Sequence, residues 1–381
     1  MDMSKTFQRA VTTAVLLFCV QIMTNYAYGG YQNAGMWVVR YQLKSQQNID
    51  RVIDFARDNG ITDIFVQVIG RGRAYYNTSI LPKSPRIKNI KYDPLAYFCE
   101  KASRENIKVH AWINTMLVWS KHRKPFESNH PVNKLQDSFT FDNLNKSILS
   151  ERQNTLKNKG IEGRFLSPAA IQVRDLYQKI VQELIDNYPI DGIHLDYIRF
   201  PSPNYGYHPF VREKFRAMTG IDPLYIDNSE LLEEFTNINE TKQKWNDFRC
   251  SQIDSLVGSV AKIIKAYPDI KISAAVKPDP VEARGKFYQD WEEWLSKNLI
   301  DFVVAMNYTS DNKEFGRIVE HIKKRQIEHK VWMGIGTYNQ NPVITDRQFN
   351  LCIQDDYKGV VFFSYKSLID KNLYVKKYGL D

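Results

Sequence analysis

The stretch DGIHLDYIRFP, residues 191–201, has the pattern of a short buried strand that ends on a carboxylate. Its Asp-Gly pair allows a turn into the strand, and side chains then alternate between the two strand faces. Ile193 and Leu195 therefore point one way, whereas His194 and Asp196 point the other. A carboxylate on an inward face is costly to bury, so Asp196 requires hydrogen bonds, water or a chemical role.

Seven more short apolar runs occur along the chain, and amphipathic helical stretches separate them. Nearly continuous apolar strands that alternate with helices are typical of parallel strands covered on both faces. Eight such units predict an α/β fold, a closed (β/α)8 TIM barrel. The predicted strands are residues 36–40, 64–69, 108–114, 192–198, 272–277, 302–308, 331–337 and 359–364.

Two connections are too long for a single helix. Residues 121–163 follow the third strand, and residues 201–237 follow the fourth; both are interrupted by proline. Both leave the C-terminal ends of the strands, where barrel enzymes carry their active sites, and long loops are commonly functional. Asp196 is therefore the main candidate for a catalytic carboxylate. The alternative is a structural ion pair between Asp196 and Arg199.

The N-terminus has the pattern of a secretory signal peptide, because two basic residues precede an apolar run at 10–23 and small residues follow it. The run is shorter than the ~20 residues of a membrane-spanning helix. Cys19 follows a phenylalanine, which disfavours lipid attachment. We predict a signal peptide at 1–29, one barrel domain at 30–381, export to the periplasm or cell envelope, and no transmembrane segment in the mature chain.

The chain is moderately basic, with 52 Lys and Arg against 43 Asp and Glu. Acidic residues are interspersed among the basic ones, which argues against nucleic acid and suits an anionic polymer such as cell wall. His110 and His194 lack a third ligand at useful spacing, and no phosphate or dinucleotide motif occurs, so neither a metal nor a cofactor is expected. The three cysteines beyond the predicted signal peptide are spaced too widely for a disulfide framework and are expected to be buried thiols: Cys99, Cys250 and Cys352.

Several longer segments resemble the bacterial glycosyl-hydrolase-like family 10 barrels, exported or envelope proteins implicated in cleaving peptidoglycan glycan strands. The similarity extends from about residue 35 to residue 368, and Arg73 stands where family members often carry an acid. It implies a TIM-barrel glycoside hydrolase that acts on a polysaccharide. The similar segments are GMWVVR (35–40), VQVIGRGRAYYNTSILP (66–82), HAWINT (110–115), SPAAIQVRDLY (167–177), DGIHLDYIRFP (191–201) and QDWEEWLSKNLIDFVVAMNYT (289–309).

Glycoside hydrolysis generally uses two carboxyl groups, one as general acid and one as nucleophile or base. The resemblance implies that Asp196 is the nucleophile or base. Glu282 and Asp279, which follow the fifth strand, are the candidates for the proton donor, and Asp311 is a weaker third. Each of these loop acids has a simple alternative as a solvated surface group.

The segment MNYT at 306–309 is also similar to a strand-six segment of chitinases, in which a Tyr orients the N-acetyl group of the substrate. Ile198 stands where that family has its catalytic Glu, which argues against transferring the mechanism directly. Sugar sites combine hydrogen-bonding groups with aromatic surfaces. The residues expected to bind substrate lie at strand ends and are Arg71, Asn114, His194, Arg199, Asn307, Tyr308 and Tyr338.

Together these patterns predict an exported glycoside hydrolase that cleaves peptidoglycan or a related cell-wall polysaccharide. Two alternatives stay open: a non-catalytic glycan-binding barrel, and a lyase or transferase on the same fold, since a fold does not determine a reaction. The exact linkage, the stereochemical outcome and the oligomeric state do not follow from the sequence.

Overall fold

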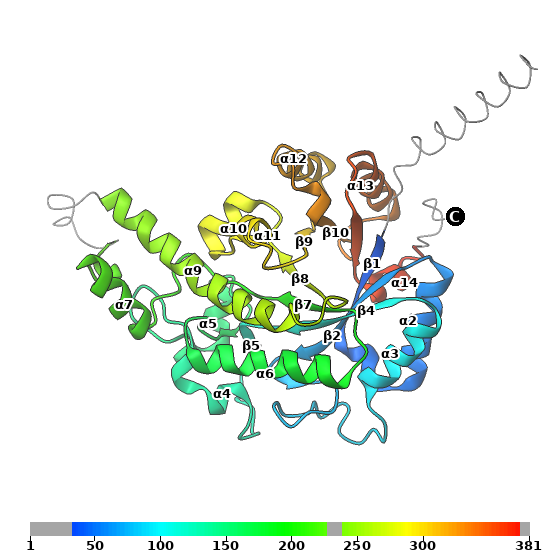
Figure 1. The fold of residues 1–381 in the computed structure, drawn as a ribbon, viewed down its shortest axis with the longest axis horizontal. Coiled ribbons are helices and arrows are strands. Elements are labelled where there is room, and N and C mark those ends of the chain that lie inside the picture. The colour runs from blue at the N-terminus through cyan, green and yellow to red at the C-terminus, as the bar shows by residue number, and fades with distance from the viewer. Residues whose placement is uncertain (1–32, 227–237, 374–381) are drawn as a thin grey trace, which may run out of the picture.

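Eight parallel strands form a closed barrel in the computed structural model, which describes residues 33–226 and 238–373 (Figure 1). The strands follow one another around the barrel in sequence order, and β1 closes it by pairing with both β2 and β11. The predicted TIM barrel is confirmed. The strands are β1 (Asn33–Val38), β2 (Asp63–Gly70), β4 (Lys108–Asn114), β7 (Gly192–Asp196), β8 (Lys271–Val276), β9 (Phe302–Asn307), β10 (Val331–Gly336) and β11 (Gly359–Phe363).

All eight predicted strands occur, and one lies earlier than predicted. The first strand was expected at 36–40, but β1 ends at Val38 because the chain then turns into the 3-10 helix η1 (Arg40–Lys44). The signal peptide expected at 1–29 lies outside the described residues. Within the described residues, no helix has both the length and the apolar character that crossing a membrane requires.

Helices cover the outside of the barrel and follow the strands in alternation. In Figure 1, α6 and α9 run side by side, as do α12 and α13. The helices of this layer are α2 (Gln46–Asp58), α3 (Pro94–Arg104), α6 (Ile171–Asn187), α9 (Ile238–Ile264), α10 (Pro280–Phe287), α11 (Trp291–Ser296), α12 (Asn312–Lys323), α13 (Pro342–Gln354) and α14 (Tyr365–Asp370).

Local sequence signals determine where several of these helices begin. Asp93 caps α3, because its side chain accepts hydrogen bonds from the backbone N–H groups of Leu95 (2.9 Å) and Ala96 (3.2 Å), and Pro94 follows at the first helical position. A side-chain oxygen at this position satisfies N–H groups that the helix itself leaves unpaired.

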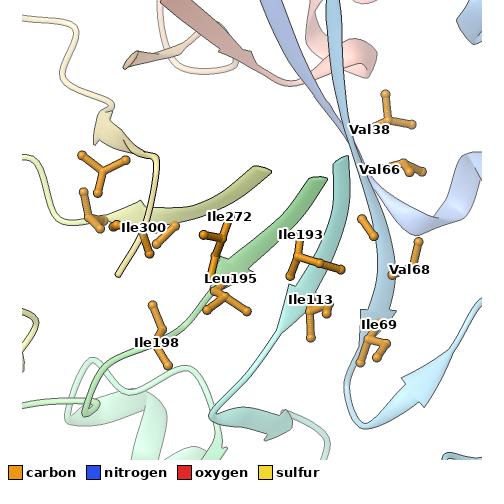
Figure 2. Packing of buried hydrophobic residues seen from close by; sticks show 14 of the residues in the cluster. Val38, Val66, Val68, Ile69, Ile113, Ile193, Leu195, Ile198, Ile272 and Ile300 are labelled. Atoms are coloured by element: carbon orange, nitrogen blue, oxygen red, sulfur yellow. The ribbon is translucent and has the colours of Figure 1, made fainter. Parts of the chain in front are cut away.

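The alternation of side chains along the strands separates two apolar layers. Ile193 and Leu195 belong to the large core between the strands and the helices, and Figure 2 shows them beside Ile113 and Ile272 of the neighbouring strands. The opposite faces fill the inside of the barrel with a second cluster dominated by large rings. Its aromatic members are Trp37, Phe65, Trp112, Phe302 and Trp332.

The two long connections add structure at the C-terminal ends of the strands. The first contains β5 (Leu117–Trp119), α4 (Pro131–Lys134), α5 (Gln153–Asn158) and β6 (Arg164–Phe165), and β5 pairs antiparallel with β6. The second contains α7 (Pro209–Thr219) and includes residues 227–237, which lie outside the described residues. The first connection contributes Leu117, Ser120 and Glu162 to the mouth of the barrel.

Candidate active site

A cavity of about 680 Å³ opens at the C-terminal ends of the barrel strands. Residues at the ends of the strands line it together with residues of the long connection after β4. Its volume falls within the range of small-molecule sites, and its position is the one that TIM-barrel enzymes use. Most of the residues expected to act on substrate line this cavity: Asp196, Glu282, Arg71, Asn114, Arg199, Tyr308 and Tyr338.

Asp196 is the last residue of β7 and is 8% exposed. The indole Nε1 of Trp112 donates a hydrogen bond to its Oδ2 at 3.0 Å, and the backbone N–H of Tyr197 donates to its Oδ1 at 2.7 Å. Burial raises the pKa of Asp196 to about 6, against the opposing effects of the Tyr197 N–H, Arg199 and Trp112. The group is therefore mostly ionised at neutral pH, and its perturbed pKa in a cavity is typical of a functional carboxyl group.

Tyr197, directly after Asp196, has a left-handed backbone (φ 53°). This conformation is uncommon for residues other than glycine, and such outliers cluster at active sites. In this conformation, the backbone N–H of Tyr197 donates to the carboxylate of the preceding residue, Asp196. Arg71, another residue of the cavity lining, also has a left-handed backbone (φ 55°).

Glu282 lies on the first turn of α10 and lines the cavity. Its carboxylate contacts Lys286 at 3.1 Å in an exposed pair one helical turn apart. Asp279, the other acid predicted after the fifth strand, is not part of the lining. It caps α10 by accepting from the N–H groups of Val281 and Glu282, and it pairs with Arg317 at 3.3 Å.

Glu162 is a third carboxyl group at the cavity, and sequence reasoning did not single it out. Its Oε1 accepts from Arg199 at 3.0 Å, so the ion pair of Arg199 is with Glu162 and not with Asp196, the partner that the sequence suggested. Gly163 brings Glu162 to this place, because a Cβ at residue 163 would lie 2.1 Å from the backbone oxygen of Trp119. Only a glycine fits there, and a Glu-Gly pair at the end of the polar loop was the available signal.

Lys277, directly after β8, is a second lining residue that the sequence did not single out. Burial lowers the pKa of Lys277 and Arg199 adds to this effect, whereas Glu162, Glu282 and Asp196 oppose it. The ammonium group is thus within electrostatic reach of all three carboxylates. Its position at the end of a barrel strand was the signal that could have found it.

Aromatic rings form much of the remaining wall. Tyr308 stacks on Phe363 with ring centroids 5.4 Å apart, and it meets Trp37 edge-on at 6.0 Å. Tyr338, 52% exposed, packs edge-on against Tyr308 at 6.1 Å. Burial and, second, the charge of Asp196 raise the pKa of Tyr308, so its hydroxyl remains a proton-bearing donor close to that carboxylate.

A row of polar side chains crosses three neighbouring strand ends at the rim. Arg40 donates to Oε1 of Gln67, and Nε2 of Gln67 donates to Oδ1 of Asn114 at 2.9 Å. Asn114 lies opposite Asp196 in the parallel register of β4 and β7. All four side chains line the cavity, so this row holds polar groups beside the carboxylate.

Two residues expected to bind substrate lie outside the cavity lining. His194 is fully buried within the barrel, where Nε2 accepts from Trp37 Nε1 at 3.2 Å and Nδ1 lies 2.9 Å from the Ser273 hydroxyl. Burial holds its pKa well below the usual value, so the ring is neutral. Asn307 is buried and donates to the backbone oxygen of Phe315 at 3.2 Å. The polar groups of both side chains therefore make hydrogen bonds within the protein interior.

The sequence of residues 32–349 matches the family described as glycosyl hydrolase-like 10. The chain belongs to this family. Glycosyl hydrolase DigH of Escherichia coli (strain K12) is 25% identical over 288 residues, which are 71% of this chain and 59% of DigH. Glycosyl hydrolase YngK of Bacillus subtilis is 22% identical over 70% of this chain and 50% of YngK. The chain therefore spans between half and three fifths of the length of these curated relatives.

Solved structures agree with the fold of this glycosyl hydrolase-like 10 chain. The glycoside hydrolase domain of PgaB (BpsB) from Bordetella bronchiseptica has a TM-score of 0.66 at 13% identity, over 92% of this chain and 99% of that domain. The catalytic domain of a β-amylase from Paenibacillus polymyxa has a TM-score of 0.59 at 11% identity, with 92% and 99% covered. At these identities the likeness concerns the fold.

Proposed function

We propose that this protein is an exported glycoside hydrolase that cleaves glycan strands of peptidoglycan or of a related cell-wall polysaccharide. One observation carries the proposal: Asp196, a buried carboxylate with a raised pKa, shares the barrel-mouth cavity with Glu282. Two carboxyl groups flanking one site are the minimum that most glycoside hydrolases need. Membership of the glycosyl hydrolase-like 10 family supports the same reaction class.

Asp196 acts as the nucleophile or base. That role needs an ionised carboxylate, and both of its oxygens already accept hydrogen bonds that favour the ionised form. The pKa of about 6 leaves it ionised at pH 7 and still basic enough to accept a proton or attack a carbon centre. Because the group is buried, its charge interacts more strongly with a developing positive charge on the sugar than it would in water.

Glu282 is the proton donor. Its one ion pair within the described part of the chain, with Lys286, is exposed, and such pairs stabilise by only about 0–1 kcal/mol. The side chain can therefore turn toward a leaving-group oxygen at little cost. Glu162 is the weaker choice, because its carboxylate is engaged by Arg199, whose side chain is only 6% exposed. We assign Glu162 and Arg199 to positioning the rim of the site around Asp196.

The wall of the cavity suits sugars. Tyr308, Tyr338 and Phe363 offer ring surfaces for the CH faces of a pyranose, and Gln67 and Asn114 offer hydrogen-bonding groups for hydroxyls. The hydroxyl of Tyr308 makes no hydrogen bond to the described residues, so it is available to the N-acetyl group of an amino sugar. Peptidoglycan sugars carry such groups.

The test is to incubate the protein with purified peptidoglycan, with and without its stem peptides, and to analyse soluble fragments by mass spectrometry. We expect fragments whose new reducing ends contain one added water, and none with Asp196→Asn. Anhydro ends would indicate a lyase and contradict hydrolysis. Binding to the polymer without any fragments would leave a glycan-binding barrel as the function.

A further inference from the structure

A second hollow of about 540 Å³ adjoins the cavity that holds Asp196, and the two share Arg40 and Arg71 in their walls. We call it the basic groove. It lies between the loop at residues 84–86 and the start of the long connection after β4, at residues 119–126. Because its walls continue into those of the active-site cavity, a chain-like substrate that fills one hollow can extend into the other.

All charged residues that line this groove are basic. Besides the two shared arginines, its lining contains Arg73, Arg86, Lys121, Arg123 and Lys124, and it contains no acidic residue. Among these cations, only Arg73 has an ion pair within the described residues, a two-point contact with Glu127 at 2.8 and 2.9 Å. Clustered like charges repel one another, and a lined hollow concentrates their field and attracts anions.

Several of the guanidinium groups are held in place by aromatic rings. Arg40 and Arg86 lie over the ring of Tyr41, at 4.7 and 4.8 Å from its centroid, and Arg73 lies over Trp119 at 4.8 Å. Arg40 and Arg73 already donate to Gln67, Tyr41 and Glu127. The Arg86 guanidinium makes no side-chain hydrogen bond within the described residues, so its planar N–H edge, which matches a carboxylate, is free. Phe126, 85% exposed, adds an open ring at the same hollow. Cations beside exposed rings suit acidic sugars, which pair a charge with apolar CH faces.

We propose that the basic groove is a substrate subsite that binds carboxylates on the part of the glycan chain that extends out of the Asp196 cavity. The substrate class is thereby narrowed to acidic polysaccharides. This inference rests on the proposed function, because it takes the two hollows as one substrate path. The spread of the cations over the length of the groove suits a polymer with repeated charges.

Binding to two matched oligosaccharides tests whether the groove recognises carboxylates. The acidic probe alternates N-acetylglucosamine with glucuronic acid, and the neutral probe is the same chain with its carboxylates as methyl esters. In calorimetry with the Asp196→Asn protein, we expect the acidic probe to bind on the order of tenfold more tightly in low salt. The advantage should vanish near 1 M salt, where the Debye length falls to about 3 Å. Equal affinity of the two probes in low salt would overturn the subsite.

A charge-reversal pair locates the binding. Arg123→Glu with Lys124→Glu changes two exposed residues of the groove that have no ion pair within the described residues. Lys108→Glu with Lys265→Glu makes the same change in net charge at exposed positions near the N-terminal ends of β4 and β8. We expect the first pair to abolish the preference for the acidic probe and the second to leave it within about twofold. Similar effects of both pairs would contradict the groove as the site.

The outcome separates this subsite from the hydrolase proposal. Selective binding of the acidic probe without cleavage of any glycan would support the groove and remove the catalytic role. If the rate of glycan cleavage is the same for the acidic and the esterified substrate, and the Arg123→Glu, Lys124→Glu variant does not change it, the proposed hydrolase function stands and the proposed subsite is wrong. Melting temperatures of both pairs, expected to agree with that of the parent within a few degrees, confirm that folding is not the cause.

Discussion

Trp112 holds Asp196 through a single hydrogen bond of 3.0 Å from the indole Nε1 to Oδ2, between neighbouring strands at the mouth of the barrel. A second pair of the same kind lies outside the cavity, where Trp294 donates to Oδ1 of Asp254 at 2.7 Å. Burial raises the pKa of both aspartates to about 6. The two pairs share local chemistry and differ in access to the cavity, so each serves as the control for the other.

Trp112→Phe removes the indole donor and keeps an aromatic ring. The hydrogen bond lowers the pKa of Asp196, so its loss should raise that pKa. If Asp196 acts ionised, the acidic limb of kcat/KM moves to higher pH, and the rate falls more at pH 6 than at pH 8. Trp294→Phe should leave the limb in place. Equal shifts in both variants, or none in Trp112→Phe, would contradict the role of Asp196.

The ionisation of Asp196 also makes stability depend on pH. Its pKa is higher in the folded protein, about 6, than in the unfolded chain, so between pH 4 and pH 6 the folded state binds more protons. Stability contributed by this group is therefore present at low pH and is lost as the pH rises through 6. As the pH rises from 4 to 7, the free energy of unfolding of Asp196→Asn should therefore increase by up to about 3 kcal/mol relative to that of the wild type.

Denaturant titrations at several pH values measure this difference. The comparison is the change in the wild type minus the change in the variant, so effects of other carboxyl groups cancel. A difference that stays constant across the range would mean that Asp196 titrates at an ordinary pKa.

The same variant should lose at least about a thousandfold in glycan cleavage, since the group that attacks or activates water is gone.

Glu282→Gln should lose most of the rate on natural glycan, which has a poor leaving group, and little on an aryl glycoside whose leaving group needs no proton. Glu162→Gln should stay within about tenfold of the wild type on both substrates. Since the charge of Glu162 raises the pKa of Asp196, this variant should move the acidic limb to lower pH.

Asp279→Asn is the matched control for these carboxyl substitutions, because asparagine also caps helices and Asp279 lies outside the cavity lining. Its rate should remain near that of the wild type. A rate on natural glycan that is unchanged in Glu282→Gln and collapses in Glu162→Gln would transfer the donor role to Glu162.

Gly163→Ala tests how Glu162 reaches the site. The added Cβ would lie 2.1 Å from the Trp119 oxygen, so the two backbones must separate. We expect a loss of about 1–3 kcal/mol in stability and a displaced Glu162. Gly258→Ala is the control, since a Cβ there meets nothing within 4 Å and the residue lies within α9; it should raise stability by about 0.5–1 kcal/mol. A melting temperature unchanged in Gly163→Ala would contradict the close approach.

The barrel and its central acid followed from the sequence. Eight apolar runs separated by amphipathic helices predicted the strands, and alternation within DGIHLD placed Asp196 on the inward face beside the mouth. Asp93 and Pro94 marked the start of α3. These features are local: strand period, helix caps and turn residues depend on neighbours a few positions away, so a single chain read in order contains them.

The partners of Asp196 were decided by the tertiary structure. Glu162 reaches the cavity because β6 pairs with β5 and Gly163 passes close to Trp119. Lys277 comes within electrostatic range of three carboxylates from separate parts of the chain. The same long-range packing paired Asp279 with Arg317 and buried His194 against Trp37. The position of a loop over the barrel mouth depends on contacts between residues that are far apart in the sequence. Such contacts leave no local pattern, so they could not be predicted from the sequence.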